Sequence, residues 1–356
     1  MSTRLRDRDY IVGAEGIIFR VLGYFHPPDG YICEPEYAPK RIFTSENPRA
    51  LRGYPEISYF KFYGDEGLRF VEENYPSYRL YVKPLKTYLV GVPNNLIAAV
   101  RKPQDRLAKI IEESYRDKLL EDTLDIVEIV CENAELNLSS LGVFGSILHE
   151  FYNPFLSDID LVVYGSKNTI KLMECLSELY SGRDSPLRNE YDFPVEKARW
   201  IFRNYSFKEY IFHERRKMIY AKYWDGSRWV KVEFEPVRDY DEYHNEYMDV
   251  NSIEKIGWVK LESIIVDDSG VYFMPATYGV EVTKLISGPK EALEASKIIS
   301  YIDEFRIQAW RDEEVYVEGM LERVVRNDEV EYQVSITYCD RYGDQVLKLK
   351  KIPGRL

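Results

Sequence analysis

The sequence predicts an α+β protein in which a mixed sheet with flanking helices lies between a β-rich N-terminal domain and a small, mostly β C-terminal domain. Three observations lead to this fold class. Short apolar runs broken by Pro and Gly fill the first hundred residues, helix-type and strand-type runs alternate from Pro103, and strand-type runs return near Gly257. We therefore expect domains over residues 1–102, 103–250 and 251–356, in line with the number of domains that 356 residues allow.

The N-terminal segment is expected to form short strands and loops. Residues 16–22 and 78–82 are apolar runs of strand length, and many Pro, Gly and Tyr residues lie between them. Residues 26–30, with the sequence HPPDG, predict a tight turn, because proline fixes φ and Asp-Gly favours a reversal.

The central segment predicts helices and strands in alternation. From Pro103 to about residue 135, apolar residues recur every three or four positions, which predicts one long helix. Strands are expected at 141–144 and 159–164, and a helix over 170–179. Residues 218–224 and 228–237 predict a β-hairpin around Asp225-Gly226-Ser227.

The last segment predicts mainly strands, over residues 259–266, 271–275, 315–325 and 332–338. Helical spacing is present over residues 290–302.

Composition limits the class and location of the protein. Hydrophobic residues make up 45% and charged residues 30%, which argues against a disordered chain, and no apolar run approaches the ~18 residues of a membrane span. The start lacks the apolar segment of a signal peptide, and the four cysteines form no C-x-x-C pair. We therefore expect a cytoplasmic protein with no membrane partner. Thirty tyrosines, few glutamines and abundant charge favour a thermophile.

The net charge of −12 argues against a protein that coats nucleic acid through a broad basic face. The charge is uneven, since residues 1–102 carry 15 Lys and Arg against 12 Asp and Glu. Any contact with a polyanion is therefore expected through the first third of the chain.

The most informative feature is a pair of acids, Asp158 and Asp160, at the start of an apolar strand. Residues two apart on a strand point to the same face, so the two carboxylates lie side by side while Ile159 and Leu161 face the core. Such acids repel one another unless a cation lies between them, and hard oxygen ligands suit Mg²⁺, with Mn²⁺ as an alternative.

Eleven residues separate this pair from Gly145-Ser146, which follows the preceding strand. Glycine allows a phosphate to come close to the backbone, and the amides and the Ser146 hydroxyl at a strand-to-helix turn can bind phosphate oxygens. A phosphate-binding turn beside a metal-binding pair is the minimum equipment for phosphoryl or nucleotidyl transfer.

At these residues the chain resembles the nucleotidyltransferase superfamily that includes DNA polymerase β, whose signature is G-S followed by D-x-D. It resembles more closely an archaeal branch with S-D-I-D-L-V-V-Y-G, here residues 157–165. Further matching motifs are R-D-R-D-Y-I at 6–11, H-P-P-D at 26–29, H-E-R-R-K at 213–217 and S-Y-I-D-E-F at 300–305. The resemblance implies Mg²⁺-dependent transfer of NMP from an NTP to an acceptor, with release of pyrophosphate.

The resemblance implies that Asp158 and Asp160 bind the metal and that a third acid comes from a neighbouring strand. Glu233, on the polar face of the second hairpin strand, is the first choice, and Glu235 is the second. Gly145, Ser146 and Ser157 are expected at the nucleotide. Two departures stand out: a glutamate replaces the usual third aspartate, and residues 147–150 lack the arginine and glycine found soon after G-S in many active members. Arg216 and Lys217, with Arg215, could supply that positive charge.

The sequence leaves the acceptor and the oligomeric state open. An RNA end, a protein side chain and a small molecule are all compatible with the motifs. The alternative to an enzyme is a catalytically inactive nucleotidyltransferase-fold module that binds a nucleotide, RNA or a protein partner. The position of the third carboxylate distinguishes the two hypotheses. His149 and His213 are expected to be structural, since no metal-ligand spacing connects the histidines.

Overall fold

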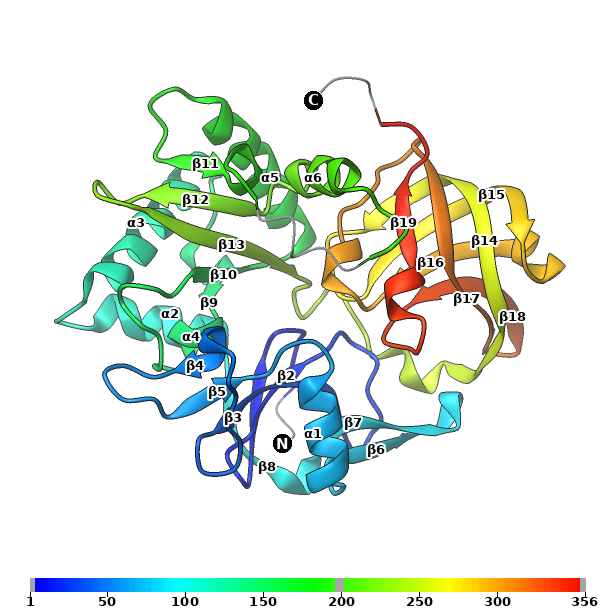
Figure 1. Cartoon of the computed structure of the whole chain (residues 1–356), viewed down its shortest axis with the longest axis horizontal. Helices are drawn as coiled ribbons and strands as arrows, with labels where there is room; N and C mark the ends of the chain where they lie inside the picture. Colours follow the sequence, from blue (N-terminus) through cyan, green and yellow to red (C-terminus); the bar gives the residue numbers. More distant parts are fainter. Residues whose placement is uncertain (1–3, 196–201, 353–356) are drawn as a thin grey trace. The chain divides into compact units, whose positions relative to one another are not determined.

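The computed structural model describes residues 4–195 and 202–352, which divide into two compact units (Figure 1). The first unit comprises Met1–Tyr81, Tyr88–Glu190 and Ile219–His244, and the second comprises Val82–Thr87, Tyr191–Met218 and Asn245–Leu356. Most of the N-terminal β segment and most of the central α/β segment therefore lie together in the first unit, whereas Tyr191–Met218 belongs to the second.

The first unit begins with an eight-stranded sheet. Six strands follow the order β4-β5-β3-β2-β1-β8, and β7 pairs with both β3 and β6. The turn predicted at residues 26–30 is present, with the Gly30 amide donating to the Pro27 carbonyl over 3.3 Å. The helix α1 (Glu66–Asn74) packs against β3. The strands are β1 (Tyr10–Gly13), β2 (Ile18–Val21), β3 (Gly30–Pro39), β4 (Leu51–Arg52), β5 (Tyr59–Lys61), β6 (Arg79–Val82), β7 (Thr87–Pro93) and β8 (Ile97–Arg101).

The second sheet of this unit has five strands in the order β11-β12-β13-β10-β9. β10 and β13 run parallel and the other pairs are antiparallel. One face packs against α5 (Ser166–Ser181), which buries Val232 and Phe234, while Lys231 and Glu233 point to the other face. The strands are β9 (Leu141–Val143), β10 (Ile159–Tyr164), β11 (Leu187–Asn189), β12 (Tyr220–Trp224) and β13 (Trp229–Val237). The predicted strands and hairpin are confirmed.

The prediction of a single long helix from Pro103 is wrong, because the structure has two helices there. The helix α2 (Pro103–Glu112) ends where the Arg116 guanidinium donates to the carbonyls of Ile110 and Ile111, with 2.8 Å to the former. The helix α3 (Lys118–Asn133) begins at Asp117, whose side chain accepts the Leu120 amide over 3.1 Å. These contacts satisfy backbone groups at the end of α2 and at the start of α3, which allows the helix to break there. The apolar spacing of the sequence continues across the break and does not reveal it.

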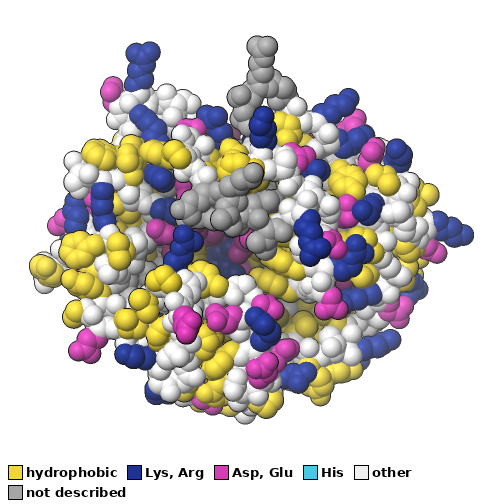
Figure 2. All heavy atoms as spheres, in the orientation of Figure 1, with side chains coloured by type: hydrophobic (Ala, Val, Ile, Leu, Met, Phe, Trp, Pro, Cys, Tyr) yellow, Lys and Arg dark blue, Asp and Glu magenta, His cyan; other side chains and the backbone are white. Residues whose placement is uncertain are grey.

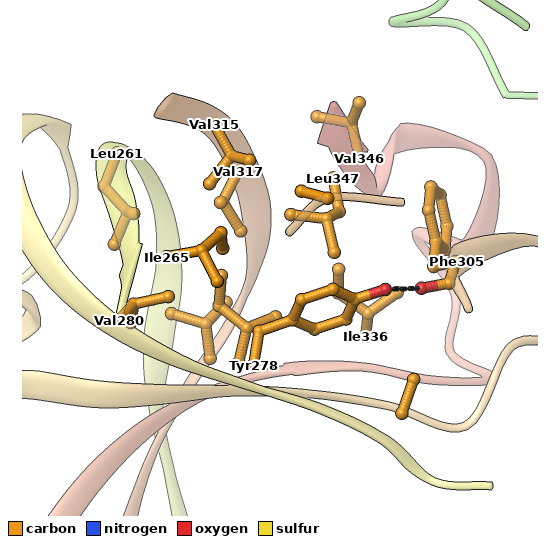
Figure 3. Packing of buried hydrophobic residues seen from close by; sticks show 14 of the residues in the cluster. Leu261, Ile265, Tyr278, Val280, Phe305, Val315, Val317, Ile336, Val346 and Leu347 are labelled. Carbon is orange, nitrogen blue, oxygen red and sulfur yellow. Dashed lines mark hydrogen bonds between the residues drawn. The ribbon is translucent and has the colours of Figure 1, made fainter. Parts of the chain in front are cut away.

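The second unit is mostly β, as predicted. Its pairings join β14, β15, β16, β18 and β17 into a closed ring, because β14 also pairs with β17, and β19 is added at β17. The Tyr278 side chain lies in the core of the ring and its hydroxyl donates to the Phe305 carbonyl over 2.6 Å (Figure 3). The unit also contains α6 (Phe207–Arg216). The strands are β14 (Val250–Gly270), β15 (Ala276–Ser287), β16 (Ala295–Ser300), β17 (Glu314–Arg326), β18 (Glu329–Ile336) and β19 (Val346–Leu349).

Two expectations for this unit are wrong. Residues 271–275 form turns between β14 and β15, because the Val271 and Phe273 amides donate to the carbonyls of Asp268 and Gly270 at the end of β14. Residues 290–302 contain only a short 3-10 turn (Lys290–Glu294), and β16 follows it. Ile298 is fully buried and β16 pairs with β15 and β18, so sheet pairing overrides the helical spacing of the sequence.

Charged side chains of both signs are present on one face of the protein. On the face drawn in Figure 2, Lys and Arg side chains are interspersed with acidic and hydrophobic ones. Among the described helices, none is long and apolar enough to cross a membrane.

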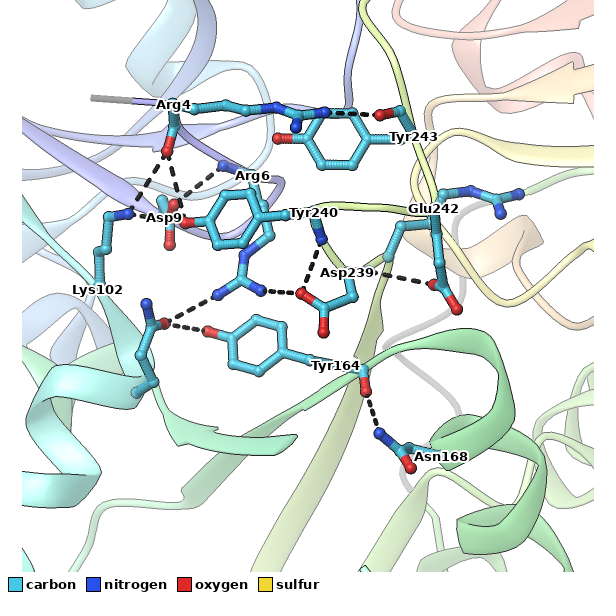
Figure 4. A network of polar contacts seen from close by, with 12 residues as sticks. Arg4, Arg6, Asp9, Lys102, Tyr164, Asn168, Asp239, Tyr240, Glu242 and Tyr243 are labelled. Carbon is cyan, nitrogen blue, oxygen red and sulfur yellow. Dashed lines mark hydrogen bonds and ion pairs between the residues drawn. The ribbon is translucent and has the colours of Figure 1, made fainter. Parts of the chain in front are cut away.

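A polar network joins the N-terminal residues to the five-stranded sheet inside the first unit (Figure 4). The buried Arg6 guanidinium lies 3.7 Å from the ring centroid of Tyr164 and 4.0 Å from that of Tyr240. Arg6 also donates to Asp239 over 2.9 Å and to Gln104 over 3.1 Å. Stacking and hydrogen bonds to a desolvated guanidinium fix the chain start against the end of β10.

Asp9, in the same network, predicts a pH dependence of stability. Burial raises its pKa to about 6, although the Arg6 amide and the charges of Lys102 and Arg6 oppose the shift. In the folded protein the Asp9 carboxyl therefore keeps its proton up to about pH 6, whereas in the unfolded chain it loses the proton near pH 4. We expect the contribution of Asp9 to stability to fall by roughly 3 kcal/mol as the pH rises through this window.

The measurement is the free energy of unfolding in urea for the wild type and for Asp9→Asn, at pH 4 and at pH 8. The free energy of unfolding of Asp9→Asn, relative to that of the wild type, is expected to be higher at pH 8 than at pH 4, because the variant has no charge to bury. A difference between the two proteins that does not change with pH would contradict the account.

Candidate active site

The pairing of β10 with β13 brings the predicted acids together. The two strands are parallel, and Asp160 lies directly opposite Glu233 in the register. Asp158 immediately precedes β10, two residues before Asp160. The electrostatic effect of Glu233 is felt at both aspartates, so the three carboxylates form one charge cluster, called here the acidic cluster (Asp158, Asp160 and Glu233).

The acidic cluster lies against the turn that follows β9. The Phe144 amide donates to the Asp160 carbonyl over 3.0 Å, and the helix α4 (Gly145–Leu148) begins at the next residue. Gly145 has φ +64°, and a Cβ atom there would lie 2.2 Å from Oδ2 of Asp160. Both the backbone conformation and the close carboxylate therefore require glycine at this position.

Burial and mutual repulsion raise the pKa of the two aspartates. For Asp160, burial has the largest effect on the pKa, the charges of Glu233 and Asp158 add to it, and Lys61 and Lys231 oppose it, so that the pKa lies well above its usual range. Burial also raises the pKa of Asp158; Lys231 opposes this shift and Glu233 adds to it. Carboxylates in such a position favour a proton or a cation.

Glu233 and Glu235 differ in their partners, and this difference separates the two choices for the third acid. Glu235 is buried and forms an ion pair with Arg8, with 2.7 Å between the oxygen and the guanidinium nitrogen. Glu233 is partly exposed beside Asp160, and its carboxylate accepts a hydrogen bond from Lys231. Lys231 Nζ also lies 3.7 Å from Glu190. The geometry therefore favours Glu233 as the third acid.

The donor set of the acidic cluster fits a hard divalent cation. Within residues 4–195 and 202–352, no hydrogen bond or ion pair is made by the carboxylates of Asp158 and Asp160, so their oxygens remain available. In the same residues, no three His, Cys, Asp or Glu side chains are arranged so that they could hold a metal ion, and this includes the acidic cluster with its present side-chain positions. Glu233 is engaged with Lys231, so it completes the set of ligands only when it exchanges this partner for a metal.

The remaining predicted residues lie in two places. The buried Ser146 lies on α4, and its hydroxyl has no hydrogen-bond partner in the described part of the chain. The Ser157 hydroxyl accepts the Asn153 amide over 2.9 Å, which fixes the loop before Asp158. Arg216 and Lys217 belong to the second unit. There Arg216 donates to Glu313 over 2.6 Å, and the buried Lys217 donates to the Glu304 carbonyl over 2.7 Å.

Cations close to the acidic cluster come from residues that sequence reasoning did not select. Lys61 on β5 and Arg52 on β4 both lower the pKa of Asp158, and Lys61 also lowers that of Asp160. Lys231, on the same strand as Glu233, also lowers the pKa of both aspartates. No local spacing marks Lys61 or Arg52, because they reach the cluster through the packing of two different sheets.

The histidines are structural, as expected. Burial lowers the pKa of His149 to about 3, and its Nδ1 accepts a hydrogen bond from Arg101 over 3.0 Å. For His213, burial lowers the pKa to about 3, and the ring lies between the Gln308 carbonyl and the Leu349 amide. Both rings are neutral and buried, so neither is positioned to titrate at neutral pH.

Comparison with known proteins finds a similarity to nucleotidyltransferase domains over part of the chain. A family model described as nucleotidyltransferase domain matches residues 125–220, a span that includes Gly145, Ser146, Asp158 and Asp160 and ends before Glu233. An uncharacterized protein of the archaeon Methanocaldococcus jannaschii is 24% identical over 356 residues, which cover 98% of this chain and 100% of that protein. No solved structure matches the chain significantly.

The contact between Gly145 and Asp160 can be tested with a double-mutant cycle. Gly145→Ala is expected to lower the free energy of unfolding by about 2–4 kcal/mol, because it combines a left-handed φ with a clash in a buried site. Asp160→Ala removes the clashing oxygen and leaves its Cβ 3.6 Å away, so Gly145→Ala is expected to cost much less in that background.

Urea denaturation of the four proteins measures this coupling. Gly182→Ala is the matched control, since Gly182 has φ −71° and a Cβ there meets nothing closer than 3.5 Å. Equal costs of Gly145→Ala with and without Asp160 would show that the carboxylate does not lie against the glycine.

Proposed function

We propose that this chain is a divalent-metal-dependent nucleotidyltransferase that transfers NMP from an NTP to an acceptor hydroxyl and releases pyrophosphate. One observation carries the proposal. The turn at Gly145-Ser146 lies against Asp160 of the D-x-D pair, and β13 places Glu233 beside the same pair. Gly145-Ser146 and Asp158-x-Asp160 match the polymerase β-like signature. The nucleotidyltransferase match over residues 125–220 supports the same reaction class.

Asp158, Asp160 and Glu233 are the residues that would hold Mg²⁺ or Mn²⁺. The available oxygens of the two aspartates and the raised pKa of each support this role. When bound, the metal supplies positive charge to the triphosphate and to the attacking oxygen. The acceptor oxygen forms a bond to the α-phosphorus, the bond from that phosphorus to the leaving pyrophosphate breaks, and the acceptor proton passes to solvent or to a nearby carboxylate.

The chain itself contributes positioning. Gly145 lets the Asp160 carboxylate lie against the start of α4, and the Ser146 hydroxyl is available as a hydrogen-bond donor to a phosphate. Ser157 holds the loop that carries Asp158. The proposal leaves three kinds of acceptor, namely an RNA end, a protein side chain and a small molecule.

The alternative function is an inactive nucleotidyltransferase-fold module that binds a nucleotide, RNA or a protein partner. It is favoured by one observation, the hydrogen bond between Lys231 and Glu233, which occupies the third acid. The two functions differ in turnover, so an activity assay separates them.

We expect the wild type to release pyrophosphate from at least one NTP in the presence of Mg²⁺ or Mn²⁺ and a pool of RNA, protein and small-molecule acceptors. Asp158→Ala and Asp160→Asn are expected to lower this rate at least about 100-fold, because each removes a ligand for the cation that neutralises the transition state. The readouts are pyrophosphate release and transfer of label from α-³²P-NTPs.

Asp184→Asn is the matched control, since Asp184 is an exposed acid of the same unit. It is expected to retain the wild-type rate. If the wild type binds an NTP but shows no turnover with any acceptor pool, the inactive module is the correct function. If Asp158→Ala and Asp160→Asn turn over at the wild-type rate, the assigned site is wrong.

A further inference from the structure

Two cations of the N-terminal sheet lie beside the acidic cluster. Lys61 on β5 is the register partner of Tyr37 on β3. Lys61 Nζ and the Arg52 guanidinium each lie 5.8 Å from the centroid of the Tyr37 ring. The two positive charges therefore lie near the same buried aromatic ring.

Tyr37 connects these cations to the turn at Gly145. Its ring lies 4.9 Å from the Phe151 ring and 5.3 Å from the His149 ring, between centroids. The Phe151 amide donates to the Ser146 carbonyl over 3.3 Å. The Gly53 amide, next to Arg52, donates to the Phe151 carbonyl over 2.7 Å. Hydrogen bonds and ring contacts thus fix the end of the N-terminal sheet against the segment that follows α4.

The charge of Lys61 is held in place by a buried acid. Glu36 Oε1 lies 3.2 Å from Lys61 Nζ, and Glu36 accepts a hydrogen bond from the Tyr10 hydroxyl over 2.6 Å. Burial raises the pKa of Glu36, but Lys61, Arg20 and the Tyr10 hydrogen bond outweigh it, and the pKa is about 2. Glu36 is therefore ionised and acts as a positioning residue for Lys61.

Lys61 keeps binding capacity beyond this pair. An ammonium has three N–H donors, and Glu36 is its ion-pair partner in the described part of the chain. The Lys61 side chain is 32% exposed, so it is not sealed from solvent. Its charge acts on both aspartates of the acidic cluster, where it partly offsets the rise in their pKa that burial causes.

We propose that Lys61 and Arg52, from the N-terminal sheet, bind the phosphates of the NTP at the active site. This proposal rests on the proposed function. A triphosphate carries about four negative charges, and three carboxylates beside it need more positive charge than the metals supply. The stretch Ile147-Leu148-His149-Glu150 after Gly145-Ser146 has no cation, and His149 is neutral. Lys61 and Arg52 lie next to that stretch, across Tyr37, so the N-terminal sheet forms the phosphate side of the site.

The test measures equilibrium binding of a non-hydrolysable NTP and of the matching NMP, both with Mg²⁺, by isothermal titration calorimetry. Lys61→Met is expected to weaken NTP binding at least about 10-fold and NMP binding less than about 2-fold, because the lost contact is to the outer phosphates. Arg52→Met is expected to act in the same direction. Lys40→Met, at an exposed lysine that follows β3, is the matched control with unchanged binding.

Lys61→Met leaves the buried Glu36 without this partner, so the double variant Glu36→Gln/Lys61→Met is included to keep the fold intact. Glu36→Gln alone is expected to weaken NTP binding less than the double variant does. Two results would overturn the inference and leave the proposed function standing. In the first, the double variant binds the NTP with the affinity of the wild type. In the second, it loses as much affinity for the NMP as for the NTP. Absence of NTP binding by the wild type would instead refute the proposed function, and the inference with it.

Discussion

Repulsion between Asp158, Asp160 and Glu233 is the constraint on which the arrangement of this protein depends. Like charges in one partly buried site are costly, and the structure shows that cost in the raised pKa of both aspartates. Several neighbouring features reduce it. Lys231 engages Glu233, Lys61 and Arg52 act from the N-terminal sheet, and Gly145 leaves room for the Asp160 carboxylate. Under the proposed function, a divalent cation would reduce this cost further.

Backbone pairing enforces the acidic cluster. The parallel register of β10 and β13 places Asp160 opposite Glu233, and a shift by one residue would turn Glu233 to the face covered by α5. The first unit fixes this register with buried ion pairs and stacked rings, among them Arg8 with Glu235 and Arg6 between Tyr164 and Tyr240. The N-terminal segment therefore supports the site as well as supplying cations to it.

Local pattern in the sequence predicted much of this site, and long-range packing supplied the rest. Gly145-Ser146 and the acids at 158 and 160 are spaced within one stretch of chain, so they are visible in the sequence. Glu233 was the first choice from the sequence and Glu235 the second, and the physical difference between them lies in the register with β10 and the ion pair that occupies Glu235. Lys61 has no local signal, since its position near the cluster depends on contacts between β3, β5 and the segment after α4. Helical spacing failed at 113–117, where Asp117 and Arg116 cap two helices, and at 290–302, where sheet pairing prevailed.

A crystal soaked with Mn²⁺ and a non-hydrolysable NTP tests the central claim most directly, because anomalous scattering locates the metal independently of turnover. The account predicts Mn²⁺ bound by Asp158 and Asp160, Glu233 released from Lys231 to join them, and the triphosphate between Gly145-Ser146 and Lys61. An NTP bound elsewhere, or a cluster that stays free of metal with Glu233 still hydrogen-bonded to Lys231, would contradict it.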